Sequence, residues 1–212
     1  MTDEPEHTEP EHAEPEHTPA AARPTRRIDA RSLRGLAHPL RMSILEVLAL
    51  DGPATATHLS RRLGENTGTV SWHLRHLAEH GYIEEEPGRG TKRERWWRAV
   101  RDAKLLDAAE FHDDPGTRDA LAVYLRQLAQ QFFARTVTYL DENWDGEWQH
   151  AATFSDWRDL RMTPAQLARL NKDLMDVVAR HTPAPGTEPD PGALPVIVQI
   201  QSFPRRERGG PA

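Results

Sequence analysis

The chain has 212 residues, enough for one large domain or two small ones, and its formal net charge is −6. It contains no cysteine, which excludes a disulfide framework, a thiolate metal centre and a cysteine nucleophile. No apolar run approaches the ~20 residues that a membrane-spanning helix needs. The acidic N-terminal stretch does not fit a signal peptide. We therefore expect a cytoplasmic protein with no membrane partner.

Charge is distributed unevenly along the chain. Residues 1–22 carry seven acidic and no basic side chains. Residues 23–101 carry 15 Lys or Arg and nine Asp or Glu, a net charge of +6, and the remainder is again acidic. A basic segment between two acidic ones is typical of a nucleic-acid-binding module with attached parts.

Residues 4–18 repeat the pattern EPEHT, EPEHA, EPEHT. A proline in every repeat prevents a helix and the acids leave nothing to bury, so we expect residues 1–22 to be a disordered tail. Its histidines could chelate a metal ion loosely, although plain low-complexity sequence is the favoured interpretation: His7, His12 and His17.

Two helices are predicted next. Leu33 and Leu36 fit a short helix that ends before Pro39, because proline disfavours helix in the residue that precedes it. Pro39 then suits the first turn of a second helix, where its missing N–H costs nothing. The apolar residues of that helix recur at helical spacing before Gly52 ends the run: Leu40, Ile44, Val47 and Leu48.

The stretch THLSRRLGENTGTVSWHLRHLAEHG predicts a helix-turn-helix. A helix of about eight residues ends at Gly64, and Asn66 is placed to cap the helix that follows. On the second helix one stripe is apolar, formed by Val70, Leu74 and Leu77. Small polar and basic residues occupy the opposite side, as in a helix that reads DNA.

A basic hairpin is expected to follow. Tyr82–Glu86 is predicted to be a strand, residues 87–91 a tight loop and residues 92–100 the returning strand. A hairpin directly after a recognition helix is a wing, and a basic tip suits contact with phosphates or the minor groove. The basic side chains at the loop and its base are Arg89, Lys92 and Arg93.

Residues 33–100 resemble the winged helix-turn-helix of ArsR-type bacterial transcriptional regulators. The resemblance is carried by LAHPLR at 36–41, VSWHLRHL at 70–77, Gly81 after the second helix, and the basic wing. It implies a homodimer that binds a partly palindromic operator in double-stranded DNA. It implies no ligand, and the absence of cysteine excludes the thiolate sensing sites of the family.

The predicted DNA-binding residues come from the second helix and the wing. We expect Arg75 to read a guanine through its two-pronged guanidinium. Trp72 can contact a thymine methyl group or give one N–H to a phosphate. The full set is Asn66, Thr67, Thr69, Ser71, Trp72 and Arg75 in the major groove, with Arg89, Lys92 and Arg93 on the flanking backbone.

The histidines of the second helix have two interpretations. His73, His76 and His80 lie within a ~60° arc and could present nitrogens to one ion. The arc borders the buried stripe, however, and the resemblance makes His73 a packing residue beside the core. We therefore favour packing for His73 and backbone contacts for the other two, with no metal and no cofactor. No catalytic motif is present, so we expect no enzyme activity.

A long helix is predicted over residues 117–141. Its apolar residues are spaced almost as in a heptad seam and need a partner. Packing on its own domain is one interpretation. A homodimer interface, which the resemblance favours, is the other, formed by Leu121, Leu125, Leu128 and Phe132.

A small α/β module is predicted at the C-terminus. Residues 153–162 are expected to be a strand. Thr163, Pro164 and Gln166 form a capping-box signature for a helix. The alternation of Val196, Val198 and Ile200 predicts a second strand. The module could bind a small-molecule effector, close the dimer or stabilise it.

Together these features predict an α+β protein. It would have a disordered tail over residues 1–22, a winged helix-turn-helix domain over 23–104, and a helical and α/β module over 105–212. The predicted function is that of a dimeric repressor. A histidine-based metal sensor and a winged helix that binds protein instead of DNA are the alternatives.

Overall fold

The computed structural model describes residues 25–91, 94–100, 103–106, 108–111, 113–184 and 186–206. The predicted tail at residues 1–22 therefore lies outside the described residues. The chain divides into two compact units, one formed by residues 23–160 with 196–201, the other containing residues 161–195. The predicted boundary at residue 104 stays a prediction.

The helix-turn-helix forms as the sequence predicts. The helices are α1 (Ala30–Leu36), α2 (Pro39–Leu50), α3 (Ala56–Leu63) and α4 (Thr67–Glu79). Each begins at a side chain that accepts a backbone N–H, which satisfies a donor that the first turn leaves unpaired. Pro39 occupies the first turn of α2, and α3 ends at Gly64 in the left-handed conformation, both as predicted.

A three-stranded antiparallel sheet completes the wing. Its strands are β2 (Ala54–Thr55), β3 (Ile83–Thr91) and β4 (Glu94–Ala99), in the order β2-β4-β3. The pairing shifts register between Glu85 and Gly90, so the expected loop is an irregular part of β3. Gly90 has φ +98°, and a Cβ there would lie 2.3 Å from the carbonyl oxygen of Glu94, so this turn requires glycine.

Several short elements were not predicted from the sequence. The strands β1 (Thr25–Arg27) and β5 (Ala103–Leu105) pair in parallel, and a short 3-10 helix, η1, covers Ala108–Phe111. Neither strand is long enough to show an alternating pattern, because three residues contain too few positions. The strand β2 was not predicted either, because it too is very short.

One hydrophobic core joins the helices to the wing. Tyr82, at the end of the turn after α4, is 1% exposed, and its hydroxyl donates a hydrogen bond of 2.9 Å to the backbone oxygen of Ser32 in α1. This contact links α1 to the wing. The other buried side chains of the core include Ile28, Leu33, Leu36, Ile44, Leu48, Leu59, Val70, Leu74, Leu77, Ile83 and Trp97.

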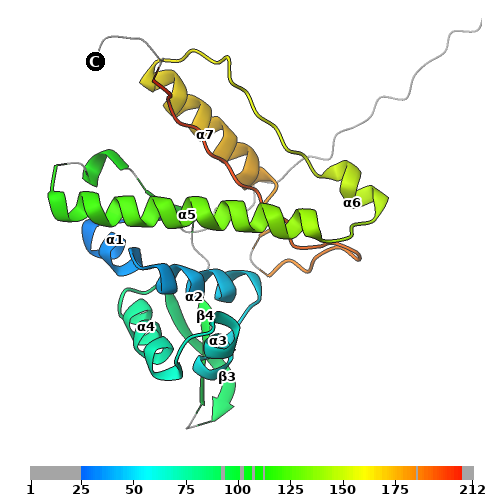
Figure 1. The fold of residues 1–212 in the computed structure, drawn as a ribbon. Helices are drawn as coiled ribbons and strands as arrows, with labels where there is room; N and C mark the ends of the chain where they lie inside the picture. The colour runs from blue at the N-terminus through cyan, green and yellow to red at the C-terminus, as the bar shows by residue number, and fades with distance from the viewer. Residues whose placement is uncertain are drawn as a thin grey trace, which may run out of the picture. The chain divides into compact units, whose positions relative to one another are not determined.

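The long helix α5 (Pro115–Asp141) belongs to the same unit and packs on α1 and α2 (Figure 1). The predicted helix is confirmed, but it begins two residues earlier. Pro115 stands in its first turn, and the Asp114 carboxylate accepts the N–H groups of Gly116 and Thr117. An ion pair of 2.7 Å between Arg135 of α5 and Glu46 of α2 holds the two helices together.

The C-terminal strands predicted from the sequence are absent. Residues 152–163 and 193–206 have no regular secondary structure, although α6 (Gly146–Ala151) precedes the first of these segments. A strand is stable only when a neighbouring strand pairs with its backbone groups, and the described chain provides no such neighbour. The alternating apolar residues of this segment therefore do not form the predicted strand.

The second unit contains α7 (Pro164–Arg180). The predicted capping box is confirmed, since the Thr163 hydroxyl accepts the N–H of Gln166 and the Gln166 side chain accepts the N–H of Thr163. The helix has an apolar side but no buried residue.

The Tyr82 hydroxyl provides a test of the core. Replacing Tyr82 with Phe removes this buried hydrogen bond to the Ser32 oxygen and should lower the free energy of unfolding by about 1–2 kcal/mol. Urea denaturation followed by circular dichroism measures this. Tyr139→Phe is the matched control and should cost much less, and equal losses for the two variants would contradict the role of this hydrogen bond.

Candidate nucleic-acid interface

Helix α4 has one buried face and one free face. Val70, Leu74 and Leu77 fill the core, as predicted. The opposite face consists of the small, polar and basic residues expected there. Thr67, Thr69, Trp72 and Arg75 are exposed and Ser71 is half-buried. The core thus fixes both the position and the rotation of the free face.

The turn before α4 is held by short hydrogen bonds. The Ser60 hydroxyl donates to the backbone oxygen of Glu65 at 2.6 Å, and the Thr67 hydroxyl donates to the Ser60 hydroxyl oxygen at 3.0 Å. The Asn66 side chain accepts the N–H of Gly68 at 2.8 Å. These contacts set the angle between α3 and α4, so Asn66 and Thr67 have a structural role in addition to any contact with a ligand.

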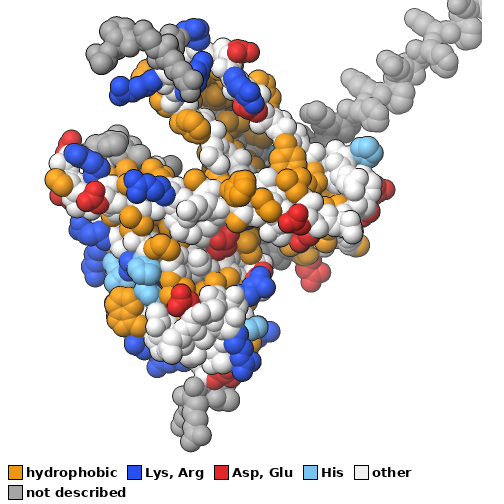
Figure 2. Space-filling view, viewed as in Figure 1, with side chains coloured by type: hydrophobic (Ala, Val, Ile, Leu, Met, Phe, Trp, Pro, Cys, Tyr) orange, Lys and Arg blue, Asp and Glu red, His pale blue; other side chains and the backbone are white. Residues whose placement is uncertain are grey.

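Aromatic rings form a continuous row along α4. The exposed Trp72 ring stacks on His76 with centroids 5.5 Å apart and an interplanar angle of 4°. The His76 ring meets His80 edge-on at 4.7 Å, and the His80 ring stacks on Tyr82 at 6.4 Å. Figure 2 shows histidine side chains gathered where α4 lies next to α1. The sequence did not predict that Trp72 stacks on this row of rings.

His73 and His80 pack against neighbouring side chains, and the DNA-backbone contacts expected of His76 and His80 stay predictions. His73 is 4% exposed, as the packing interpretation predicts, and its ring lies 4.5 Å from that of His38. A Cβ on Gly35 of α1 would lie 2.8 Å from the His80 ring, so His80 packs directly on α1. Among the described residues, no group of three or more His, Cys, Asp or Glu could hold a metal ion.

Burial keeps these imidazoles neutral. Desolvation, reinforced by His38, Arg41 and His76, lowers the pKa of His73 to about 4. Burial also lowers the pKa of His76, and Arg41 adds to the shift. The pKa of His80 is lowered by burial first and then by its positively charged neighbours. The row of rings is therefore uncharged near neutral pH.

The wing carries its free charge near the tip. The exposed Arg89 guanidinium lies over the Trp96 ring, 5.0 Å from its centroid. Lower on the strands, Arg98 is paired with Glu84 at 2.8 Å and with Glu86 at 3.3 Å. Lys92 and Arg93, which the sequence places in the interface, lie outside the described residues.

Further arginines border the free face of α4. Arg61 and Arg62 end α3, and Arg95 lies on β4. All three are exposed, although Arg62 also pairs with Asp51 at 2.9 Å. Figure 2 shows Lys and Arg side chains over the ends of α3 and α4. From the sequence alone, only Arg61 and Arg62 could have been expected at this face, because they form a basic pair just before the turn.

The four residues of the predicted dimer seam on α5 differ in how deeply the fold buries them. Leu121 is 4% exposed because it belongs to the core of its own unit. Leu128 and Phe132 are half-buried, and Leu125 is exposed. Other apolar side chains of α5 remain exposed on a broad neighbouring face: Val123, Phe133, Val137 and Leu140.

No helix among the described residues is long and apolar enough to span a membrane.

Residues 36–86 match the family model described as a helix-turn-helix domain. A search of curated proteins gave no match.

Solved structures of three bacterial proteins resemble parts of the chain. Reduced HlyU from Vibrio cholerae is 26% identical over 33% of this chain and 70% of its own, with a TM-score of 0.29. The transcriptional repressor BigR from Xylella fastidiosa is 21% identical over 46% and 81%, with a TM-score of 0.30. NMB1585, a MarR family regulator from Neisseria meningitidis, is 20% identical over 68% and 80%, with a TM-score of 0.31. Scores this low do not establish a shared overall fold.

Three features point to the same domain type: the order of the helices, the hairpin after α4, and the family match over residues 36–86. This part of the chain is a winged helix-turn-helix domain, the DNA-binding module of transcriptional regulators. The match does not distinguish the ArsR type from other winged helices.

The buried His73 makes stability depend on pH. Its pKa is about 4 in the folded chain, against 6.5 for an ordinary histidine. The unfolded chain therefore binds more protons between these values, so the contribution of His73 is complete above pH 6.5 and is lost as the pH falls toward 4. His73→Gln should reduce the loss of unfolding free energy between about pH 7 and about pH 5.

Urea denaturation of both proteins at each pH measures this difference. An identical pH dependence of wild type and variant would contradict the neutral, buried state of His73. His58→Gln, at an exposed position on α3, is the control and should leave the pH dependence unchanged.

Proposed function

We propose that the protein is a dimeric, sequence-specific DNA-binding transcriptional repressor whose helix α4 enters the major groove of its operator. The observation that carries this proposal is the free face of α4, which is polar, exposed and held rigidly by the core on its other side. A rigid helix with short polar side chains fits the width of the major groove.

Each side chain of α4 has a role that fits its surroundings. Arg75 is exposed and has no ion pair among the described residues, so its guanidinium is free to bind the O6 and N7 atoms of a guanine. Trp72, 54% exposed and held by His76, offers a flat apolar edge to a thymine methyl group. Thr69 and Ser71 supply hydroxyls. We also place Asn66 and Thr67, which are exposed at the start of α4, in the major groove.

The wing is proposed to hold the flanking phosphates. Arg89 extends from the hairpin and rests on Trp96, which limits its freedom without neutralising its charge. Lys92 and Arg93, which lie outside the described residues, are proposed from the sequence alone as two further phosphate contacts. Such contacts position the protein on the duplex but carry no sequence information.

Dimerisation is proposed to use α5. A single α4 covers one half-site, and two half-sites about one helical turn apart are normally read by a symmetric pair. Phe133 is 71% exposed and Leu140 is 64% exposed, which is costly for a helix facing water. We place the interface on this face together with Leu125, Leu128 and Phe132, while Leu121 remains in the core of its own unit.

A winged helix used to bind another protein is the second candidate. The exposed Trp72 favours it, because tryptophan is common at the centre of protein interfaces. It gives no reason for the exposed arginines of α3 and the wing. The C-terminal region is proposed to stabilise the dimer or to respond to a small effector, and the protein is proposed to act in the cytoplasm.

The role of Arg75 in base reading can be tested directly. Arg75→Ala should weaken binding to the preferred operator by about 1–3 kcal/mol and relax the preference at one base pair, because the bidentate contact is lost. Gel-shift titrations on an operator selected from random DNA measure both effects. Arg169→Ala, at an exposed position on α7, is the matched control and should bind as wild type does.

Arg89→Ala should affect DNA binding differently from Arg75→Ala. Removing one phosphate contact should weaken binding to all sequences alike and reduce the slope of log K against log salt concentration by about 1. An unchanged slope would remove the wing from the interface.

The dimer can be tested at exposed positions, where a substitution spares the fold of each unit. Phe133→Glu with Val137→Glu should give monomers, because two carboxylates would be buried without partners in the interface. Operator binding should weaken strongly, because a monomer binds one half-site and loses the gain in affinity from binding two linked half-sites. Light scattering and gel-shift titration on the same samples measure these outcomes.

The conservative pair Phe133→Leu with Val137→Ile keeps an apolar surface and should remain dimeric. If the double glutamate variant were still a dimer that binds its operator tightly, the interface would not lie on this face of α5.

A further inference from the structure

Two hydroxyl groups form a directed chain of hydrogen bonds across the turn between α3 and α4. The Ser60 hydroxyl donates to the backbone oxygen of Glu65 at 2.6 Å, and the Thr67 hydroxyl donates to the Ser60 oxygen at 3.0 Å. A backbone oxygen can only accept a hydrogen bond, so the single Ser60 proton is used in the bond to Glu65. Ser60 can therefore only accept from Thr67, and the direction of both bonds is fixed.

This direction determines what Thr67 can offer to a ligand. A hydroxyl group has one proton to donate and two lone pairs that accept. Because the proton of Thr67 is directed at Ser60, only a lone pair remains for an outside group. A threonine whose hydroxyl rotates freely could donate or accept, whereas Thr67 in this structure is an acceptor alone.

The neighbouring Asn66 has the opposite polarity. Its side-chain oxygen accepts the N–H of Gly68 at 2.8 Å. Its amide nitrogen, which only donates, remains for a ligand. A phosphate or carbonyl oxygen that approaches the start of α4 can therefore bond to Asn66, but it has nothing to gain from Thr67.

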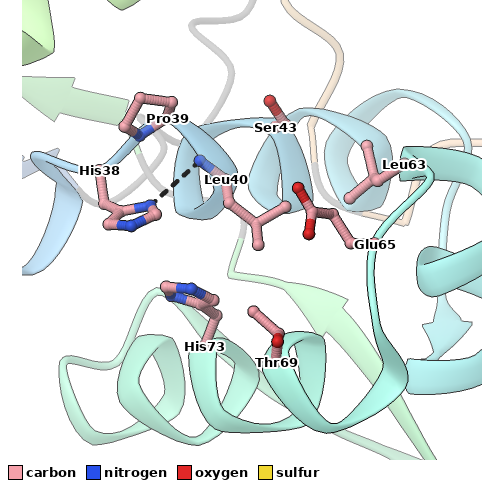
Figure 3. Close-up of a pocket in the computed structure, with 8 residues that line it drawn as sticks. All are labelled: His38, Pro39, Leu40, Ser43, Leu63, Glu65, Thr69 and His73. Atoms are coloured by element: carbon pink, nitrogen blue, oxygen red, sulfur yellow. Dashed lines mark hydrogen bonds between the residues drawn. The ribbon is translucent and has the colours of Figure 1, made fainter.

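Thr67 is exposed and lies on the face of α4 proposed to enter the major groove. A cleft of about 420 Å³ borders the same turn, and Figure 3 shows the Glu65 side chain directed into it, between α2 and α4. His73 and Thr69 line this cleft from α4, whereas Ser60 and Thr67 do not line it. The hydroxyl of Thr67 is therefore open to a ligand at the outer surface of the turn.

Few groups of DNA suit an acceptor that cannot donate. Phosphate oxygens, the N7 atoms of both purines, guanine O6 and thymine O4 are themselves acceptors, so none of them can bond to it. The donors in the major groove are the exocyclic amino groups, at N6 of adenine and N4 of cytosine. An amino group is therefore the major-groove feature that complements Thr67.

We propose that Thr67 selects an exocyclic amino group in the major groove, that of adenine or cytosine, because Ser60 fixes the Thr67 hydroxyl as an acceptor. The inference rests on the proposed function, since it requires α4 to enter the major groove. Thr67 contacts the base, and Ser60 is a positioning residue that acts through Thr67. A carbonyl oxygen at the same place on the base pair is rejected.

Removing the amino group tests the contact. In the duplex that the full-length protein selects from random DNA, each adenine is replaced in turn by purine and each cytosine by 2-pyrimidinone, which lack the amino group. Gel-shift titration should show a position in each half-site where binding falls roughly threefold to tenfold, the effect of one neutral hydrogen bond. The replacement that has this effect identifies the base as adenine or cytosine.

Two variants assign that loss to Thr67. Thr67→Val keeps the shape of the side chain without the hydroxyl, so it should bind the unmodified duplex more weakly by a similar factor. It should then show no further loss when the amino group is removed. Thr67→Ser keeps the hydroxyl and should lose as much affinity as wild type does.

The role of Ser60 is tested by exchanging the amino group for a carbonyl oxygen at the same position, with guanine in place of adenine or uracil in place of cytosine. This exchange should weaken binding of wild type about tenfold or more. In Ser60→Ala the Thr67 proton can turn toward the carbonyl oxygen, so the ratio of the two affinities should fall severalfold. Recognition of the guanine assigned to Arg75 should stay unchanged, which separates this effect from a general loosening of α4.

Thr57→Ala is the matched control, because it removes an exposed hydroxyl of α3 outside the hydrogen-bonded pair. It should leave the affinity ratio as in wild type. The free protein gives a further measurement without DNA. Three-bond NMR couplings of Thr67 in the full-length protein should show a single χ1 rotamer, as a committed hydroxyl requires.

Four results would overturn the proposal. They are an equal loss for wild type and Thr67→Val at every modified base, an unchanged affinity ratio in Ser60→Ala, rotamer averaging at Thr67 in the free protein, and a loss on replacing thymine by uracil that Thr67→Ser alone abolishes. The last result would assign the Thr67 methyl group to thymine. A pool that stays random would overturn the proposed function and this inference with it, whereas a selected duplex with any of the four results overturns the inference alone.

Discussion

The packing of the apolar stripe of α4 into the core is the constraint on which the rest of the winged helix depends. Val70, Leu74 and Leu77 are almost completely buried, so the helix cannot rotate without exposing them. Burying three such side chains contributes several kcal/mol, at about 1.5–3 kcal/mol each. That packing leaves Trp72 and Arg75 facing outward, and the hydrogen bonds around Ser60 fix the turn that leads into the helix.

The histidine row shows how the same helix meets its neighbours. An imidazole is small and flat, so His73 and His80 fill the narrow spaces against His38 and Gly35 where a larger ring would not fit. Because burial keeps His73 neutral, its polar nitrogen is retained beside the core at low electrostatic cost. The packing also leaves the Nδ1 atom of His73 buried without a hydrogen-bond partner.

The sequence predicted what local chemistry determines. Asn66, Gly64 and Pro39 mark helix ends through their own backbone preferences, and the stripe of α4 follows from a helical period. It could not predict features set by distant partners. The pairing of β1 with β5 joins segments more than seventy residues apart. The alternation at Val196 and Val198 suggested a strand, but the described part of the chain provides no partner strand. For the site, the free face of α4 could be predicted from the sequence. The stack of Trp72 on His76 and the cleft at His73 could not, because they depend on tertiary packing.

The central claim is that the free face of α4 reads DNA in the major groove. The most direct measurement is selection of duplexes from a random DNA pool by the purified protein, followed by methylation interference at guanine N7, which lies in the major groove. We expect enrichment of a partly palindromic sequence whose interfering guanines form two groups about one helical turn apart. A pool that remains random after repeated selection, or a selected sequence in which no guanine N7 methylation interferes with binding, would contradict it.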